Sequence, residues 1–255
     1  MSFAEVPVSA TVVPALLAAV NNPESSAVSV AEVVASDTGL AAGVLATANS
    51  AAFGLVRRVV ELEMAVTLIG VDLVQALALA RSSRLLDGAG GLPHARHHAI
   101  ETACAARLLA GRAGLPESGA FAAGLLHDVG EILLWQHDAQ AYSSARASWA
   151  DTDAQLRSER GLFGADHATA AREQLNAWGL PGAIVDAVGD HHRPDLAHHD
   201  LSTVVAAAED LVHAYGDRPD RDRLDLGADM LEHLRGAVAE EAAELETVLS
   251  GASIR

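Results

Sequence analysis

The spacing of the apolar residues restricts this chain to helices. Leu, Val and Ile recur three and four residues apart in its longer segments, and no segment shows the strict alternation of a half-buried strand. Half of the residues are hydrophobic but only 4% are aromatic, so the core must consist mainly of Ala, Leu and Val, which suit closely packed helices. The sequence therefore predicts an all-α protein.

Capping residues and glycines divide the first third of the chain into five predicted helices. Residues 12–20 form the first of these helices. The capping-box sequence Ser29-Val30-Ala31-Glu32 is expected to open the second, and Asp37 or Thr38 to cap the third. Such a succession of short helices predicts a compact bundle.

The segment 87–93, with three glycines and a proline, has the most linker-like composition in the chain. It predicts an N-terminal helical bundle over residues 5–86, packed against a second helical domain over residues 94–216. Residues 222–255 form a C-terminal helical extension with Leu and Val at spacings of three and four. This extension either docks on its own domain, which we favour, or binds a partner or a second copy of the chain.

The formal net charge of −17 gives the molecule a negative field that repels phosphate backbones and anionic lipids. We therefore expect neither nucleic acid nor membrane as a partner. The single cysteine, Cys104, excludes an internal disulfide. The first residues lack the pattern of a signal peptide and no transmembrane segment is recognisable, so the cytoplasm is the expected location.

The most unusual local feature is His127-Asp128, which interrupts the apolar stretch from Phe121 to Trp135. Helical spacing on both sides predicts that this pair lies within a buried helix. A buried carboxylate beside a histidine is costly unless a partner or a metal ion compensates it. The pair is therefore the first candidate for a functional site.

Further histidines and one aspartate lie on other predicted helices, so a helical bundle could bring them to His127 and Asp128. Imidazole nitrogens with one or two carboxylates suit Zn, Fe, Mn or Ni better than Ca or Mg. One metal ion, or two that share Asp128, would fit this set. The candidates are His98, His127, Asp128, His167, His191, His192 and Asp210.

The order of these motifs resembles the HD superfamily of metal-dependent phosphohydrolases, and more closely its HDOD branch. Residues 121–134 are similar to the central family motif, and His98 to the ligand on the preceding helix. Asp166-His167-Ala168 and His191-His192-Arg193-Pro194 follow in the family order, and Asp210 occupies the place of the last HD aspartate.

The first third of the chain separates HDOD from a plain HD phosphohydrolase. Residues 30–40 resemble the stretch in which the family usually has Asp-Pro-Leu, although the proline is replaced here. Residues 48–54 are similar to the family's Asn-Ser motif, and residues 65–70 to its Ala-Ile-x-x-Leu-Gly helix. The resemblance covers roughly residues 5–215.

The resemblance implies an all-helical module of bacterial signalling proteins, many of which have lost phosphohydrolase activity. It also implies that the seven candidate residues named above are metal ligands, and that Asp128 is catalytic if the protein is active. HD phosphohydrolases commonly carry Lys after the His-Asp-x-Gly turn, but Glu131 stands there in this chain. A carboxylate at this position would repel an anionic substrate. Arg193 could supply a cation, but we favour an ordinary surface role for it.

Asn49 and Ser50 could bind the backbone of a partner, but a helix C-cap and turn is the preferred interpretation.

Three functions remain open. The first is an HDOD-type signalling protein that binds one or two transition metal ions, Fe, Mn or Zn, and acts through contacts with a signalling partner. The second is an active phosphohydrolase on a nucleotide or cyclic dinucleotide, in which metal-activated water attacks phosphorus. The third is a metal-free helical scaffold whose histidines are packed and hydrogen-bonded.

Overall fold

The structure, a computed structural model, describes residues 12–20, 22, 24–50, 53, 58–83, 85, 92, 94–194, 200–213 and 223–251. Within these ranges the regular elements are α-helices and there is no strand, which confirms the predicted all-α class. The predicted linker lies largely outside the described residues, because 87–91 and 93 are among those not described. The division into domains stays a prediction.

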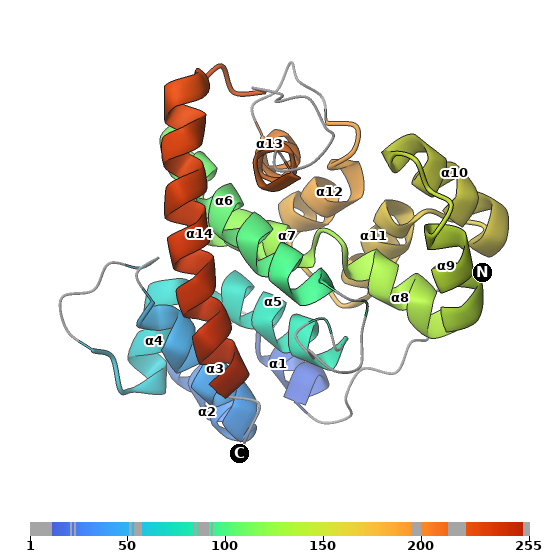
Figure 1. The fold of residues 1–255 in the computed structure, drawn as a ribbon. Coiled ribbons are helices and arrows are strands. Elements are labelled where there is room, and N and C mark those ends of the chain that lie inside the picture. The colour runs from blue at the N-terminus through green and yellow to red at the C-terminus, as the bar shows by residue number, and fades with distance from the viewer. Residues whose placement is uncertain are drawn as a thin grey trace.

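The first half of the chain folds into helices (Figure 1), and their buried apolar residues belong to the same core as those of the later helices. The helices of the first half are α1 (Val12–Val20), α2 (Ala27–Ala35), α3 (Thr38–Ala48), α4 (Leu62–Ile69), α5 (Val71–Ser82), α6 (Ala95–Ala113) and α7 (Glu117–Leu126).

The second half of the chain folds into helices that pack on α6, on α7 or on one another. Its helices are α8 (Val129–His137), α9 (Ala139–Arg146), α10 (Thr152–Phe163), α11 (His167–Ala177), α12 (Gly182–Asp190), α13 (Leu201–His213) and α14 (Ala228–Gly251).

The N-terminal caps explain where α2 and α3 begin. Asp37 caps α3, as predicted, because its side chain accepts a hydrogen bond from the Leu40 backbone N–H. The expected start of α2 at Ser29 was wrong by three residues. The capping box is formed by Ser26, and Ser29 is its third helical residue, whose side chain bonds back to the Ser26 N–H. A serine at both positions made the two registers hard to separate in the sequence.

Helices α6 and α7 form the centre of the molecule and pack closely against each other. Gly124 of α7 permits this approach, because a Cβ there would lie 2.8 Å from the Thr102 carbonyl oxygen of α6. Helix α5 packs on α7, and α13 packs on α6. The two central helices therefore connect the N-terminal helices to the helices that carry the later histidines.

Helix α14 lies along the side of the molecule and packs on both α6 and α3 (Figure 1). The favoured expectation of docking on the same chain is thereby confirmed. Its apolar face is buried at Leu231, Leu234, Val238, Leu245 and Leu249.

No single described helix combines the length and the apolar composition needed to cross a membrane. Helices α4 and α5 would meet both criteria only together, and a bend of 102° separates them.

Candidate metal centre

His127 and Asp128 lie at a junction between two helices. The prediction of one uninterrupted helix was wrong here, because α7 ends at Leu126 and α8 begins at Val129. Asp128 has φ −100° and ψ 14°, which lies outside the helical region and changes the direction of the chain. This break brings the two successive side chains together, with His127 Nε2 3.1 Å from Asp128 Oδ2.

The two oxygens of Asp128 face two groups of histidines. Oδ2 lies 3.1 Å from His127 Nε2 and 3.5 Å from His98 Nε2. Oδ1 lies 3.5 Å from His167 Nε2 and 3.7 Å from His191 Nε2. Asp128 is therefore the common member of both groups.

His192 completes the second group, since its Nε2 lies 2.7 Å from His167 Nε2. The donor atoms of Asp128, His167, His191 and His192 all lie within 4.8 Å of one another, as do those of His98, His127 and Asp128. The structure thus brings together six of the seven candidate ligands. Two donor groups that share a carboxylate have the composition of one or two transition metal sites.

Hydrogen bonds at Nδ1 fix the orientation of three of these imidazole rings. His127 Nδ1 donates to the Gly124 carbonyl at 2.8 Å, and His191 Nδ1 donates to the Val188 carbonyl at 2.5 Å. His167 Nδ1 donates to Glu159 Oε2 at 2.7 Å. In the neutral ring the lone pair then lies on Nε2, which points toward Asp128 in each case.

One ring nitrogen in the cluster is buried without a hydrogen-bond partner. His191 is 1% exposed and its Nε2 has no partner among the described residues, although such an atom costs free energy when it is left unpaired. A metal ion would satisfy it. The residues present therefore fit a bound cation.

Carboxylates determine the protonation of His127 and His167. Burial disfavours the charged form of both rings, but the Asp128 carboxylate outweighs it and raises the pKa of His127 to about 9. Glu159, and then Asp128, raise the pKa of His167 to about 10. Burial by itself would raise the pKa of Asp128, but His127 and the other surrounding histidines hold it well below its usual range. Asp128 is therefore ionised at neutral pH.

His191 and His192 are neutral for the opposite reason. Burial is the largest influence on each and lowers the pKa of His191 to about 4 and that of His192 to about 2. Both rings therefore offer a lone pair at neutral pH, which is the form that binds a metal ion.

The structure places the second carboxylate differently from the sequence analysis. Asp210 forms an ion pair with Arg223 and is not among the groups of donor atoms around Asp128. The neighbouring Glu209 faces the cluster instead, with Oε2 3.7 Å from His192 Nδ1. Adjacent residues on a helix point about 100° apart, and here Glu209 faces the site while Asp210 points toward Arg223.

A cavity of about 290 Å³ opens beside the cluster. Its wall includes Glu131, whose carboxylate pairs with Arg146 at 3.7 Å and accepts a hydrogen bond from Gln155. Burial, followed by the negative charge of Asp128, raises the pKa of Glu131. Arg193 is exposed and does not line the cavity, which agrees with the favoured surface role.

The sequence analysis also missed two histidines at this cavity. His94 lies at the start of α6 with a φ of 71°, and His213 lies at the end of α13. The His213 ring lies 4.6 Å from that of His98, and its Nδ1 donates to the Glu209 carbonyl at 3.0 Å. Neither histidine stands in a motif, since His94 follows Pro93 and His213 follows Leu211 and Val212, so the sequence does not mark them as site residues.

Asn49 and Ser50 have structural roles. Asn49 ends α3, and its side chain bonds to both backbone groups of Val59, with its Nδ2 2.8 Å from the Val59 oxygen and its Oδ1 2.7 Å from the Val59 nitrogen. Ser50 is buried and donates to the Thr47 carbonyl at 2.8 Å. The preferred interpretation as a C-cap and turn is therefore supported.

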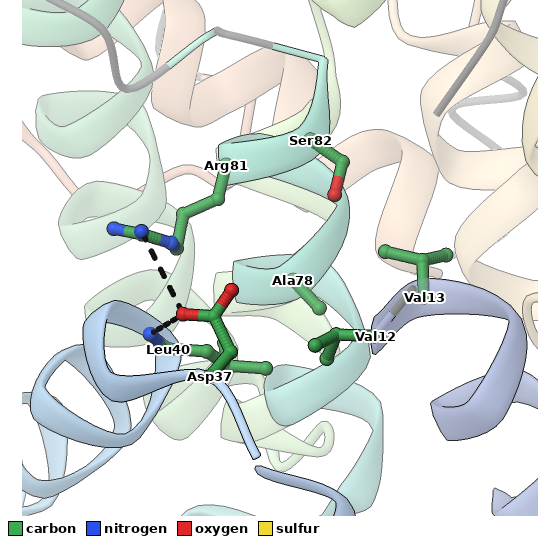
Figure 2. Close-up of a pocket in the computed structure, with 7 residues that line it drawn as sticks. All are labelled: Val12, Val13, Asp37, Leu40, Ala78, Arg81 and Ser82. Carbon is green, nitrogen blue, oxygen red and sulfur yellow. Dashed lines mark hydrogen bonds and ion pairs between the residues drawn. The ribbon is translucent and has the colours of Figure 1, made fainter. Parts of the chain in front are cut away.

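A second, smaller cavity of about 90 Å³ lies between α1, α3 and α5 (Figure 2). Asp37 and Arg81 face each other across it at 3.8 Å, beside the side chains of Val12 and Leu40 (Figure 2). The Asp37 carboxylate already accepts the capping hydrogen bond from the Leu40 N–H. This cavity therefore lacks the convergence of donor atoms that surrounds Asp128.

Comparison with protein families gives a match to the HDOD domain over residues 6–194. This chain belongs to the HDOD domain family. The match covers the N-terminal helices together with His98, His127, Asp128, His167, His191 and His192, so this HDOD chain carries six of the candidate ligands inside the family region. Glu209, Asp210 and α14 follow that region. No curated protein matches the chain significantly.

Solved structures share the fold of this HDOD protein. A protein from Shewanella amazonensis SB2B, provisionally described as a phosphohydrolase, is 25% identical with a TM-score of 0.72, over 97% of this chain and 96% of that one. A provisionally described signal transduction protein from Marinobacter aquaeolei VT8 is 22% identical with a TM-score of 0.68, over 97% of this chain and 60% of that one. An HDOD domain protein of unknown function from Geobacter sulfurreducens is 20% identical with a TM-score of 0.65, over 98% and 95% of the two chains.

Proposed function

We propose that this HDOD protein is a regulatory protein that binds one or two transition metal ions around Asp128. The observation that carries the proposal is the convergence of five histidine side chains on the half-buried Asp128 carboxylate, with the His191 Nε2, which has no hydrogen-bond partner, among them. Imidazole nitrogen with a single carboxylate favours Fe, Mn or Zn over Ca and Mg. When bound, the metal would take the place of the protons that His127 and His167 hold on the nitrogens that face Asp128.

Elemental analysis of the untagged full chain, purified without chelator, tests the proposal. We expect one or two equivalents of Fe, Mn or Zn per chain in the wild type, and loss of most of the metal in Asp128→Ala, since this substitution removes the shared ligand. Asp186→Ala, an exposed aspartate on α12, is the matched control and should retain the metal. A folded wild-type chain that takes up none of these ions, even after incubation with each, would leave the metal-free scaffold as the function.

A second candidate function is metal-dependent hydrolysis of a phosphorylated nucleotide or cyclic dinucleotide. The cavity beside Asp128 supports it, because a ligand there would reach both the metal position and the Arg146 guanidinium. The Glu131 carboxylate opposes it, since it stands where HD phosphohydrolases commonly have Lys and pairs with Arg146 at 3.7 Å. The regulatory function is therefore the first proposal.

Phosphate release separates the two functions. Manganese-loaded protein is incubated with a panel of nucleotides and cyclic dinucleotides, with Asp128→Ala as the negative control. The regulatory function predicts no release above this control. Turnover by the wild type alone would establish the hydrolase.

We also propose that the protein acts in the cytoplasm on a signalling partner, as other HDOD modules are expected to do. The family membership supports this part of the proposal. A homodimer through an exposed face is a separate possibility for assembly, and light scattering of the metal-loaded chain at several concentrations would detect it.

A further inference from the structure

Glu159 of α10 is fully buried, although nothing in the sequence marks it as part of the centre. Its side chain is 0% exposed and lies in a helix with a polar, charged outer face. An ionised carboxylate in such a place is costly unless several donors satisfy it. The donors around Glu159 therefore indicate its role.

Four donors meet the two oxygens of Glu159. Oε2 accepts from the His167 backbone N–H at 2.8 Å and from His167 Nδ1 at 2.7 Å. Oε1 accepts from the Tyr142 hydroxyl at 3.3 Å and from Gln155 Nε2 at 3.0 Å. Glu159 also lies near Glu131 in a group that could hold a cation, but these donors already occupy its oxygens. Glu159 is therefore unsuited to be a metal ligand itself.

We propose that Glu159 is a positioning residue of the metal centre, which keeps the hydrogen of His167 on Nδ1 so that Nε2 faces the metal position. The inference rests on the proposed metal-binding function. Because Oε2 accepts hydrogen bonds from both the backbone N–H and the ring of His167, it fixes the start of α11 and the rotation of the ring together. A carboxylate bonded to the far nitrogen of a ligating histidine also increases the basicity of the nitrogen that binds metal.

The same contacts couple the α9–α10 hairpin to the centre. Tyr142 of α9 is fully buried, with its ring centroid 5.2 Å from that of Trp149 and 6.1 Å from that of Phe163. Its hydroxyl reaches Glu159, so the aromatic cluster of the hairpin is joined to His167 through one carboxylate. Metal binding and docking of the hairpin should therefore support each other.

The experiment compares Glu159→Gln and Glu159→Ala with Glu173→Gln, an exposed glutamate on α11, in the full chain. Zinc affinity is measured by competition with a chromophoric chelator, after circular dichroism has shown that each variant is folded. We expect affinity to fall about 10- to 100-fold in the alanine variant. Glutamine keeps the shape of the side chain but loses its charge, so its affinity should lie between alanine and wild type. Glu173→Gln should bind as the wild type does.

Nuclear magnetic resonance of ¹⁵N-histidine-labelled, zinc-loaded protein gives a readout that packing alone would not change. The wild type should show one strongly deshielded ring N–H, assigned to His167, that moves upfield in Glu159→Gln while the other ring signals stay in place. Glu159 variants that bind zinc as tightly as the wild type, or an unchanged N–H signal in Glu159→Gln, would overturn the inference. If the wild type itself binds no zinc, iron or manganese, the proposed function fails first and this inference with it.

Discussion

Glu209 Oε2 lies 3.7 Å from His192 Nδ1, so α13 contributes its glutamate and not the following aspartate to the edge of the metal centre. We expect Glu209→Gln to weaken metal binding about tenfold, because it removes a negative charge beside a ligand. Asp210→Asn is the matched control and should change affinity less, since Asp210 pairs with Arg223. Chelator competition on both variants measures this difference, and the reverse order would restore Asp210 as the site residue.

Gly130 determines how closely α8 approaches α11. A Cβ at this position would lie 1.9 Å from the His167 carbonyl oxygen, which is backbone and cannot move independently of α11. We expect Gly130→Ala to lower the free energy of unfolding by roughly 3 kcal/mol and to displace His167. Urea unfolding and metal content are the measurements.

Gly161→Ala in α10 is the control for this substitution. A Cβ there would meet no atom within 4 Å, so alanine should stabilise the helix by up to about 1 kcal/mol. Equal effects of the two alanine variants would contradict the proposed close approach of α8 and α11.

Arg107 connects three helices from an almost buried position on α6. Its guanidinium contacts Glu117 of α7 at 3.1 Å and Glu241 of α14, and its side chain is 9% exposed. We expect Arg107→Ala to destabilise the protein by about 3 kcal/mol, because the Glu241 carboxylate, whose side chain is only 13% exposed, would lose this cationic partner. Thermal and urea unfolding test this. Arg112→Ala, which removes an exposed arginine from the same helix, should remain within about 0.5 kcal/mol of the wild type.

Cys104 should be inert in the folded protein. It is fully buried on α6, and burial raises the pKa of its thiol far above the usual value. A thiol reagent at pH 8 should therefore label no cysteine in the native chain and one per chain in guanidinium. Rapid labelling of the native protein would show that α6 opens readily, contrary to its central position in the fold.

Sequence reasoning predicted the helices well where capping and apolar spacing agree. Asp37 begins α3 through its side-chain cap, and Gly70 ends α4 with a positive φ. Both boundaries depend on the residue type at one position and are therefore visible in the sequence. The break at His127-Asp128 was not predictable in this way. The residues at the break, Leu126 to Val129, include neither glycine nor proline, and apolar residues continue on both sides. Its cause is tertiary, since α8 must turn to pack on α11.

The candidate site was predictable in its histidines and less so in its carboxylates. His98, His127 and His167 stand in motifs whose order can be read along the chain. Glu159 looks like a surface residue in a polar helix, and its burial depends on contacts with Tyr142 of α9 and with His167 at the start of α11. Whether Glu209 or Asp210 faces the centre depends on the rotation of α13 about its own axis. The packing of α13 determines this rotation, and the sequence does not show it.

The contact between α3 and α14 has a consequence for folding kinetics. Residues 38–48 meet residues 228–251, so almost the whole described chain must be arranged before these two helices can touch. Closing so large a loop costs entropy before any contact compensates it, and contacts of high sequence separation slow folding. The local helix pairs can form early, whereas the docking of α14 on α3 belongs to the last steps by which the native topology is reached.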